Sequence, residues 1–337
     1  MEFKDFYTQT PQKYYDCGND YKKQNAQDMI SNKNGLYLAT QKNDGEWCRI
    51  IIGSDKITLQ SRTISKVTGE YGDKTLHVPH IIEELKCFPC DTVLLGELCF
   101  ADITKTSKDV GTILRCLPPK AVARQQNGPK LILKLFDCLC YNGFIRMDQG
   151  YEERFTTLVN GVDYTNSQFG LKYISVTDYT DTNFEDFLQE ILAKGGEGIV
   201  IHKKDYPYSP GSRTSWKTLK VKKIVEELEL PVVDTIEPNK LYEGIEKDSW
   251  KYWVDGIAVT KPYYYGWKNG VIVDNGGTLV RVASGLTDDD REWLATDEAQ
   301  QLIKDDKLFA QVTAMEVVAD SGSLRHPRLV RLRTDVK

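Results

Sequence analysis

The sequence predicts an α+β protein of two domains, in which antiparallel sheets with helices precede a small, partly closed β-barrel. Short β-forming runs separated by turn residues begin near residue 36, and an amphipathic helix pattern lies near residue 190. A second group of short strands with Gly/Asn turns follows residue 230. The length of 337 residues agrees with two domains, since one domain commonly holds about 100–200 residues.

The first strands are expected after a polar lead-in of 35 residues that we predict to be helical or irregular. The β-forming runs are 36–42, 47–53 and 56–61. Turn residues separate them, Asn43-Asp44-Gly45 first and Gly53-Ser54-Asp55 second. This pattern predicts a meander of three antiparallel strands.

The sequence pattern in the middle of the chain predicts alternating strands and helices. A helix is expected at 81–86, followed by apolar strands at 92–98 and 131–137. The clearest helix is 184–194, whose apolar residues recur at the helical period. Thr182 and Glu185 are predicted to form a capping box at its start. Gly195 is expected to end it, before a buried strand at 198–202.

The second domain is expected to contain short strands and one helix. The predicted strands are 252–261, 270–273, 278–283 and 311–318. A capped helix is expected near 287–294. Strands of this length with one helix favour a small barrel over a sandwich.

Composition excludes several classes of protein. Hydrophobic residues at 40% and charged residues at 28% are typical of a globular chain, and the net charge is −5, so any nucleic-acid surface must be local. The sequence holds no run of about 18 apolar residues, so no membrane span is expected. The start of the chain has no apolar signal pattern, and the eight cysteines are scattered. We therefore expect a cytoplasmic monomer with free thiols.

The segment Lys42-Asn43-Asp44-Gly45 places a lysine at a strand end, before a sharp turn. A lysine becomes a nucleophile when its environment lowers the pKa of its amine. The four residues alone are a weak signal, but further charges lie within or beside apolar strands. These are Glu97, Glu197, Lys220 and Lys222. Because such charges are costly unless they are paired or functional, they predict one shared polar pocket.

The order and spacing of these motifs resemble the ATP-dependent polynucleotide ligases of the covalent nucleotidyltransferase superfamily, and DNA ligases most closely. The segments 280–285 and 326–335 also resemble a barrel strand and the last motif of DNA ligases. The resemblance covers about residues 36–337. It implies a nucleotidyltransferase (adenylation) domain at 1–230 and an OB-fold domain at 231–337.

The resemblance also implies a reaction. An ATP-dependent DNA ligase forms a lysine–AMP intermediate, transfers AMP to the 5′-phosphate of a nick in duplex DNA, and joins that phosphate to the 3′-hydroxyl. Mg²⁺, or Mn²⁺ in its place, is the expected metal cofactor. Nicked double-stranded DNA is the expected partner.

Residue roles follow from the same resemblance. Lys42 would be the nucleophile, the backbone at Thr40 and Gln41 would line the adenine, and Phe136 would stack on it. Glu97 would hold the ribose and a metal.

The remaining charged residues would act on phosphate and metal. Glu197 would help to hold the divalent metal, while Lys220 and Lys222 would neutralise the α-phosphate. Arg333 and Asp335, from the second domain, would orient the leaving pyrophosphate.

The sequence departs from the family pattern beside the nucleophile. Arginine usually follows the motif glycine by two residues, but Trp47 stands there and Arg49 comes two residues later. Either could contact AMP, and Arg62 would contact phosphate. Many relatives carry an acid where this chain has Thr40.

Several alternatives remain open at this stage. An RNA ligase, or a DNA ligase that tolerates RNA at the nick, would share these motifs, and so would an mRNA-capping guanylyltransferase. A non-enzymatic nucleic-acid clamp would use the same basic faces. His77-x2-His80 and Cys87-x2-Cys90 suggest zinc only weakly, because the gap between the pairs is short.

Overall fold

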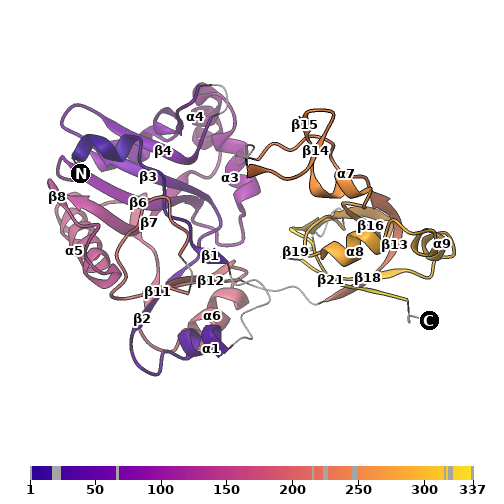
Figure 1. The fold of residues 1–337 in the computed structure, drawn as a ribbon. Helices are drawn as coiled ribbons and strands as arrows, with labels where there is room; N and C mark the ends of the chain where they lie inside the picture. The colour runs from indigo at the N-terminus through magenta and orange to yellow at the C-terminus, as the bar shows by residue number, and fades with distance from the viewer. Residues whose placement is uncertain are drawn as a thin grey trace. The chain divides into compact units, whose positions relative to one another are not determined.

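The structure is a computed structural model that describes residues 2–16, 24–65, 68–214, 216–222, 227–244, 249–314, 316–317 and 322–334. The chain divides into two compact units, Met1–Lys222 and Lys223–Lys337 (Figure 1). The first unit holds two sheets with helices, and the second holds a curled sheet. The predicted domain boundary near residue 230 falls within strand β13 (Leu228–Ile236).

The first sheet of the first unit has five strands in the order β1-β12-β11-β2-β10. Their bounds are Tyr15–Asp16, Thr218–Lys222, Gly198–Lys203, Tyr37–Gln41 and Tyr179–Thr180. All neighbours are antiparallel except β1 and β12. Two helices, α1 (Gln24–Ser31) and α6 (Phe184–Ala193), lie side by side on this sheet (Figure 1).

The second sheet has seven strands, in the order β5-β4-β3-β6-β7-β8, with β9 beside β7. The bounds of β3 to β6 are Glu46–Ile52, Ile57–Ile64, Tyr71–Asp73 and Thr92–Phe100. Those of β7 to β9 are Leu131–Tyr141, Phe144–Ile145 and Ile174–Val176. Its neighbours are antiparallel apart from β7 and β9.

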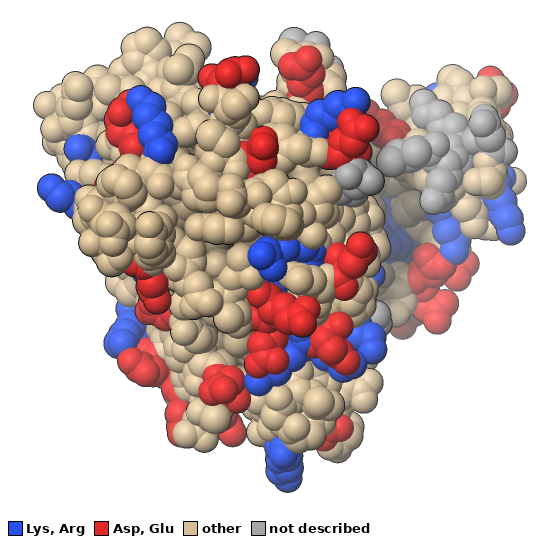
Figure 2. Space-filling view, turned by 90° about the vertical axis from the view of Figure 1, so that its left-hand side faces the viewer, with Lys and Arg blue, Asp and Glu red and all other residues tan. Residues whose placement is uncertain are grey.

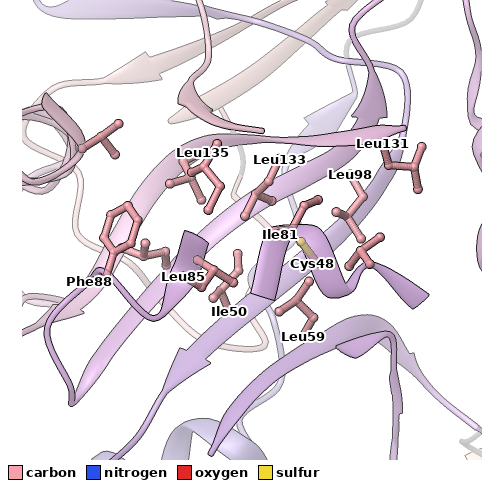
Figure 3. Close-up of a cluster of buried hydrophobic side chains, with 14 of the residues drawn as sticks. Cys48, Ile50, Leu59, Ile81, Leu85, Phe88, Leu98, Leu131, Leu133 and Leu135 are labelled. Carbon is pink, nitrogen blue, oxygen red and sulfur yellow. The ribbon is translucent and has the colours of Figure 1, made fainter. Parts of the chain in front are cut away.

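Helices cover one face of this sheet and bury the largest core. They are α2 (Pro79–Leu85), α3 (Ser107–Leu114), α4 (Pro118–Gln126) and α5 (Tyr151–Phe169); short 3₁₀ turns lie at Phe3–Tyr7 and Thr75–His77. Figure 3 shows Ile81 and Leu85 of α2 among strand residues such as Ile50, Leu98 and Leu133. Each fully buried aliphatic side chain contributes about 1.5–3 kcal/mol.

The expected three-stranded meander is wrong at its first turn. Strands β3 and β4 pair as an antiparallel hairpin, but β2 belongs to the other sheet. The turn at Asn43-Asp44-Gly45 therefore crosses between sheets. A local hydrophobic pattern predicts strands but does not identify the sheet that a strand joins, because strands of both sheets bury apolar residues.

The predicted helix at 184–194 is confirmed as α6, but its expected capping box is wrong. Asn183 is the N-cap, in the left-handed region (φ 52°), and makes no side-chain cap hydrogen bond. Gly195 follows the C-cap with a φ of +82°, as expected of a helix end. The longest helix, α5, had no strong apolar stripe in the sequence and was not predicted.

The second unit is built on five antiparallel strands in the order β17-β16-β13-β18-β21. The bounds of β16, β17, β18 and β21 are Gly270–Asn275, Thr278–Val282, Phe309–Thr313 and Arg328–Arg333. The amide of Leu329 donates to the carbonyl of Ser284 at 2.8 Å, so β21 curls back towards the end of β17. This contact supports the predicted partly closed barrel.

Shorter elements complete the second unit. They are the hairpins β14 (Trp253–Val254) with β15 (Ile257–Ala258) and β19 (Glu316–Val317) with β20 (Leu324–Arg325), and the helices α7 (Lys261–Tyr265), α8 (Asp288–Trp293) and α9 (Asp297–Lys304). The capped helix expected near 287–294 is confirmed: Thr287 and Asp290 form a capping box at α8. The strand expected at 252–261 is instead a hairpin followed by a helix.

The face in Figure 2 mixes basic and acidic side chains and has broad uncharged areas, as a net charge of −5 leads one to expect. None of the helices within the described ranges is both long and apolar enough to cross a membrane.

Candidate active site

A pocket of about 110 Å³ lies between the two sheets of the first unit. The five-stranded sheet contributes Thr40, Gln41, Val200, His202 and Lys220 to its lining. The seven-stranded sheet contributes Trp47, Arg62, Glu97 and Phe136. The rest of the lining consists of Gln12, Tyr14, Lys42 and Asn43. Most of the residues predicted from scattered motifs thus meet in one place.

Lys42 comes directly after β2, at the crossing between the sheets. Its amide donates to the carbonyl of Gly198 at 2.8 Å, which continues the β2–β11 ladder by one residue. The next two residues fix the turn: Asn43 Nδ2 donates to Thr177 Oγ1 at 2.8 Å, and Asp44 Oδ1 accepts from the amide of Ser107 at 3.0 Å. The backbone that carries the lysine is therefore held on both sides.

Gly45 allows this turn to touch the second sheet. A Cβ atom there would lie 2.2 Å from the carbonyl oxygen of Leu98 and 2.9 Å from Cγ of Glu97. No side chain fits at the first distance, so glycine is required for a close approach. The approach brings Lys42 and Glu97 to the same pocket from two different sheets.

Glu197 connects two of the lysines. One carboxylate oxygen forms an ion pair with Nζ of Lys42, and the other lies 4.0 Å from Nζ of Lys222. The exposed fractions of the three side chains are 9% for Glu197, 16% for Lys42 and 19% for Lys222. Such a partly desolvated cluster interacts more strongly than the same charges in water.

Glu97 is a half-buried carboxyl in the middle of β6. Burial raises its pKa to about 7; the nearby charge of Lys42 opposes this shift, and that of Glu197 adds to it. The carboxyl therefore changes charge near neutral pH. A perturbed carboxyl in a pocket is typical of a functional site.

The two predicted phosphate-binding lysines share one face of β12, as their spacing indicates. Lys220 lines the pocket, and its amine lies 5.8 Å from the centre of the Tyr14 ring. Lys222 approaches Glu197 at the other end of the strand face. Alternation along the strand thus puts both side chains on one face, where Lys220 lines the pocket and Lys222 does not.

Phe136, Thr40 and Gln41 line the pocket. Phe136 is half-buried in β7, and its carbonyl accepts from the hydroxyl of Tyr151 at 2.7 Å. Thr40 is 2% exposed, and its hydroxyl lies 3.3 Å from Nε2 of His202.

Trp47 lines the pocket and Arg49 does not, although both lie on β3. Arg49 is 1% exposed, and its guanidinium donates to Oε1 of Gln60 at 2.8 and 3.1 Å and to the carbonyl of Gln9 at 2.7 Å. It connects the lead-in to the sheet. Arg62, in contrast, lines the pocket and donates to the carbonyl of Gln12 at 3.3 Å.

The sequence does not single out four of the residues that line the pocket: Gln12, Tyr14, Val200 and His202. The first two lie just before β1, which pairs in parallel with β12 beside Lys220. A two-residue strand gives almost no periodic signal, so the lead-in looked irregular. His202 ends the apolar run of β11 and looked like a core residue.

A buried ion pair lies next to Phe136 in the sequence. Arg154 of α5 makes a bidentate contact with Asp137, at 2.8 Å from Nε to Oδ1 and 2.9 Å from Nη2 to Oδ2. Their side chains are 3% and 1% exposed. Because Asp137 follows Phe136 directly, the pair fixes the strand that carries this ring.

Of the two site residues predicted in the second unit, the structure describes one. Arg333 lies at the end of β21, where Nη1 contacts Oε2 of Glu229 at 3.1 Å. Asp335 lies outside the described residues.

The carboxylates of Glu97 and Glu197 suit a magnesium or manganese ion, since both are hard cations that prefer oxygen ligands. No cluster of three or more His, Cys, Asp or Glu side chains gathers within the described ranges. A metal here would therefore take its other ligands from phosphate and water, as Mg²⁺ commonly does. The weak zinc pattern forms no such cluster: His77 and His80 each contact a backbone carbonyl at 2.9 Å.

Comparison with known proteins gives a consistent result. A family model described as the ATP dependent DNA ligase domain matches residues 21–222. A DNA ligase of Methanococcus maripaludis is 27% identical over 327 residues, which cover 87% of this chain and 52% of that protein. A DNA ligase of Archaeoglobus fulgidus is 29% identical over 312 residues, with 87% and 51% covered. The chain spans about half the length of the curated relatives it matches.

Solved structures share the fold. A structure from a study of Lig E DNA ligases has a TM-score of 0.59 at 16% identity and covers 89% of this chain and 93% of that one. The structure named Pmar-Lig_PreS3 has a TM-score of 0.67 at 21% identity, with 96% and 67% covered. They confirm the predicted fold class: antiparallel sheets with helices, followed by a small OB-fold barrel.

Proposed function

Since the chain belongs to the ATP-dependent DNA ligase family, we propose that it seals nicks between 5′-phosphate and 3′-hydroxyl ends in duplex DNA. The observation that carries this proposal is the position of Lys42. Its amine lies in the same pocket as Lys220, Glu97 and Phe136. The amine of Lys42 suits an attack on phosphorus, and Lys220 suits the negative charge of a phosphate. Glu97 suits a metal or a sugar, and the ring of Phe136 suits a base.

In the first step, the neutral amine of Lys42 attacks the α-phosphorus of ATP. A nitrogen–phosphorus bond forms, and the bond to the leaving pyrophosphate breaks. The ammonium must lose a proton for this attack. Glu197 contacts the amine and is placed to receive that proton.

Lys220 and Lys222 stabilise the charge that develops on the α-phosphate. Phosphoryl transfer depends mainly on positioning and on charge neutralisation, so two amines on one strand face fit the need. Glu97 and Glu197 would hold Mg²⁺ or Mn²⁺, which would neutralise charge on the phosphates. Arg62 would contact phosphate.

The later steps pass AMP to the 5′-phosphate of the nick and then expel it as the 3′-hydroxyl attacks. The lysine–phosphorus bond breaks in the first transfer, and the amine is regenerated. Arg333 and Asp335 of the second unit would act only on the pyrophosphate of the first step. Arg333→Ala should then slow adduct formation more than the sealing of a pre-adenylylated nick.

One experiment tests the reaction directly. Protein, Mg²⁺ and α-labelled ATP should give an acid-labile label on Lys42, and the labelled protein should seal nicked duplex DNA. Labelling with GTP would favour a capping enzyme, and sealing only of nicks with RNA strands would favour an RNA ligase. DNA binding without any nucleotide adduct would indicate a non-enzymatic protein that clamps nucleic acid. Monomeric state and cytoplasmic location stay predictions.

A further inference from the structure

A second cavity of the first unit lies apart from the pocket that contains Lys42. It is a surface groove of about 780 Å³ between α5, the β7–β8 hairpin and the turn that follows α2. Among the residues that the structure describes, the two cavities share no lining residue. β8 and α5 lie at the left of Figure 1, and the face seen from that side in Figure 2 has broad uncharged areas. The groove is therefore a separate surface, outside the candidate active site.

Aromatic side chains make the groove partly apolar. Tyr164 and Phe169 of α5 line it and are 67% and 61% exposed, and Tyr141 lines it from the end of β7. Phe144, in the adjoining β7–β8 hairpin, is 68% exposed. Exposed aromatic side chains that gather on one surface are typical of an interaction site.

Three side-chain amides also line the groove, from Asn142, Asn160 and Gln168, and all three residues are exposed. Asn160, Tyr164 and Gln168 follow one another at intervals of four residues, so they lie along one side of α5. An amide has two N–H donors and an acceptor oxygen, which match the C=O and N–H groups of an extended peptide. The groove thus combines apolar contacts with groups that can bind a polypeptide backbone.

Arg146 alone carries a charge among the described residues that line the groove. Its side chain is half-buried, and Nη1 donates to Oε1 of Gln149 at 3.1 Å. Nε is buried and has no acceptor within the described part of the chain. A buried donor without a partner is costly. A carboxylate can accept from Nε and Nη2 together, so it would supply the missing acceptor and neutralise the charge.

We propose that this groove binds an extended segment of a partner protein, in which a carboxylate pairs with Arg146 and a neighbouring apolar side chain packs on Tyr164. The amides of Asn142, Asn160 and Gln168 contact the backbone of that segment. A peptide fits better than a nucleic acid, because one cation cannot neutralise a run of phosphates. The proposal does not depend on the ligase reaction.

The probe is a library of random hexapeptides, capped at both ends and displayed on beads. Fluorescently labelled full-length protein selects peptides from it, and the bound peptides are sequenced. The wild type should enrich peptides that hold Asp or Glu next to Phe, Tyr, Trp or Leu, and Arg146→Gln should lose the preference for the acid. No acid preference in the wild type, or an equal preference in Arg146→Gln, would overturn the proposal.

The most enriched peptide is then titrated by fluorescence polarisation. Arg146→Gln should weaken its binding about tenfold, because a hydrogen bond to a charged group is lost. Arg146→Lys should retain part of the affinity, since it keeps the charge without the planar guanidinium. Tyr164→Ala removes an exposed ring and should weaken binding about fivefold. Circular dichroism verifies the fold of each variant, and unchanged affinity in Arg146→Gln would contradict the proposed ion pair.

Arg124→Gln is the matched control. Arg124 is an exposed arginine of α4, outside the groove lining, and Nη1 contacts the carbonyl of Thr112. This variant should bind the peptide as the wild type does.

Two further measurements decide between occupants of the groove. Sedimentation velocity compares the wild type with Tyr164→Ala, and binding of labelled nicked duplex DNA compares the wild type with Arg146→Gln. Neither substitution should alter the result. A dimer that only the wild type forms would assign the groove to a second copy of this chain. DNA binding weakened by Arg146→Gln would assign it to nucleic acid, and either result would overturn the proposal.

Discussion

Lys42 and Glu197 form an ion pair that joins the end of β2 to the residue just before β11. The two residues are 155 positions apart in the chain, and the ladder between β2 and β11 brings them together. The pair stabilises the charged amine, whereas the proposed reaction needs the neutral amine. Glu197 therefore contacts the group that must lose a proton before Lys42 attacks.

Lys42→Arg should abolish nucleotide adduct formation, with a loss of at least about a thousandfold. Arginine keeps the positive charge beside Glu197, but its guanidinium stays protonated and is a poor nucleophile. Intact-mass spectrometry after incubation with ATP and Mg²⁺ measures the adduct. Lys134→Arg is the control, because Lys134 is outside the pocket lining and lies 3.8 Å from Asp178. A Lys42→Arg protein that gains one nucleotide would show that another residue is modified.

Gly45→Ala should slow adduct formation about a hundredfold, a loss typical of a misplacement of about 1 Å. The added Cβ would collide with the carbonyl of Leu98 at 2.2 Å, so the turn must move away from β6. The rate is measured by quenching reactions with labelled ATP at a series of times and counting the label on the protein. In Gly53→Ala, the control, the nearest atom would be the carbonyl of Lys56 at 3.3 Å. Equal rates in the two variants would show that the approach of the turn to β6 does not matter.

The sequence predicts much of this site because charges within apolar strands are rare. Glu97 and Lys220 were recognisable in this way, and both line the pocket. What the sequence does not reveal is the partner of each charge. Asp137 also follows an apolar strand, but it pairs with Arg154, from a helix that gave no clear pattern.

The pairing of strands is the other feature that escapes local patterns. The turn after Lys42 has the residues of a hairpin, yet β2 and β3 belong to different sheets. Contacts distant in sequence decide this, since β2 pairs with β11. The same holds for the lead-in, where Tyr14 reaches the pocket because β1 adds to β12.

Asp137→Asn should lower the free energy of unfolding of the first unit by about 3–5 kcal/mol, because it leaves the buried Arg154 guanidinium without its counter-charge. Urea denaturation followed by circular dichroism measures the change. Glu190→Gln removes an exposed ion pair with Lys194 and should have no measurable effect. If Asp137→Asn were as mild as this control, the pair would not be important for the stability of the site.

Glu97 should make the stability of the protein depend on pH. Its pKa rises from 4.5 to about 7 in the folded state, so between these values the folded protein binds more protons than the unfolded chain. The free energy of unfolding should therefore fall as the pH rises from about 4.5 to about 7, and Glu97→Gln should remove this part of the dependence. Urea denaturation at a series of pH values, without divalent metal, measures it.

A matched substitution and a second measurement separate this effect from general acid–base behaviour. Glu83→Gln changes an exposed glutamate of α2 that pairs with Lys86, and it should leave the slope unaltered. Because a metal binds the ionised carboxylate, adduct formation at limiting Mg²⁺ should rise with pH through about 7 in the wild type. Identical stability slopes in the wild type and Glu97→Gln would show that the pKa of this carboxyl is the same in the folded and unfolded states, and the rise in activity would then need another titrating group.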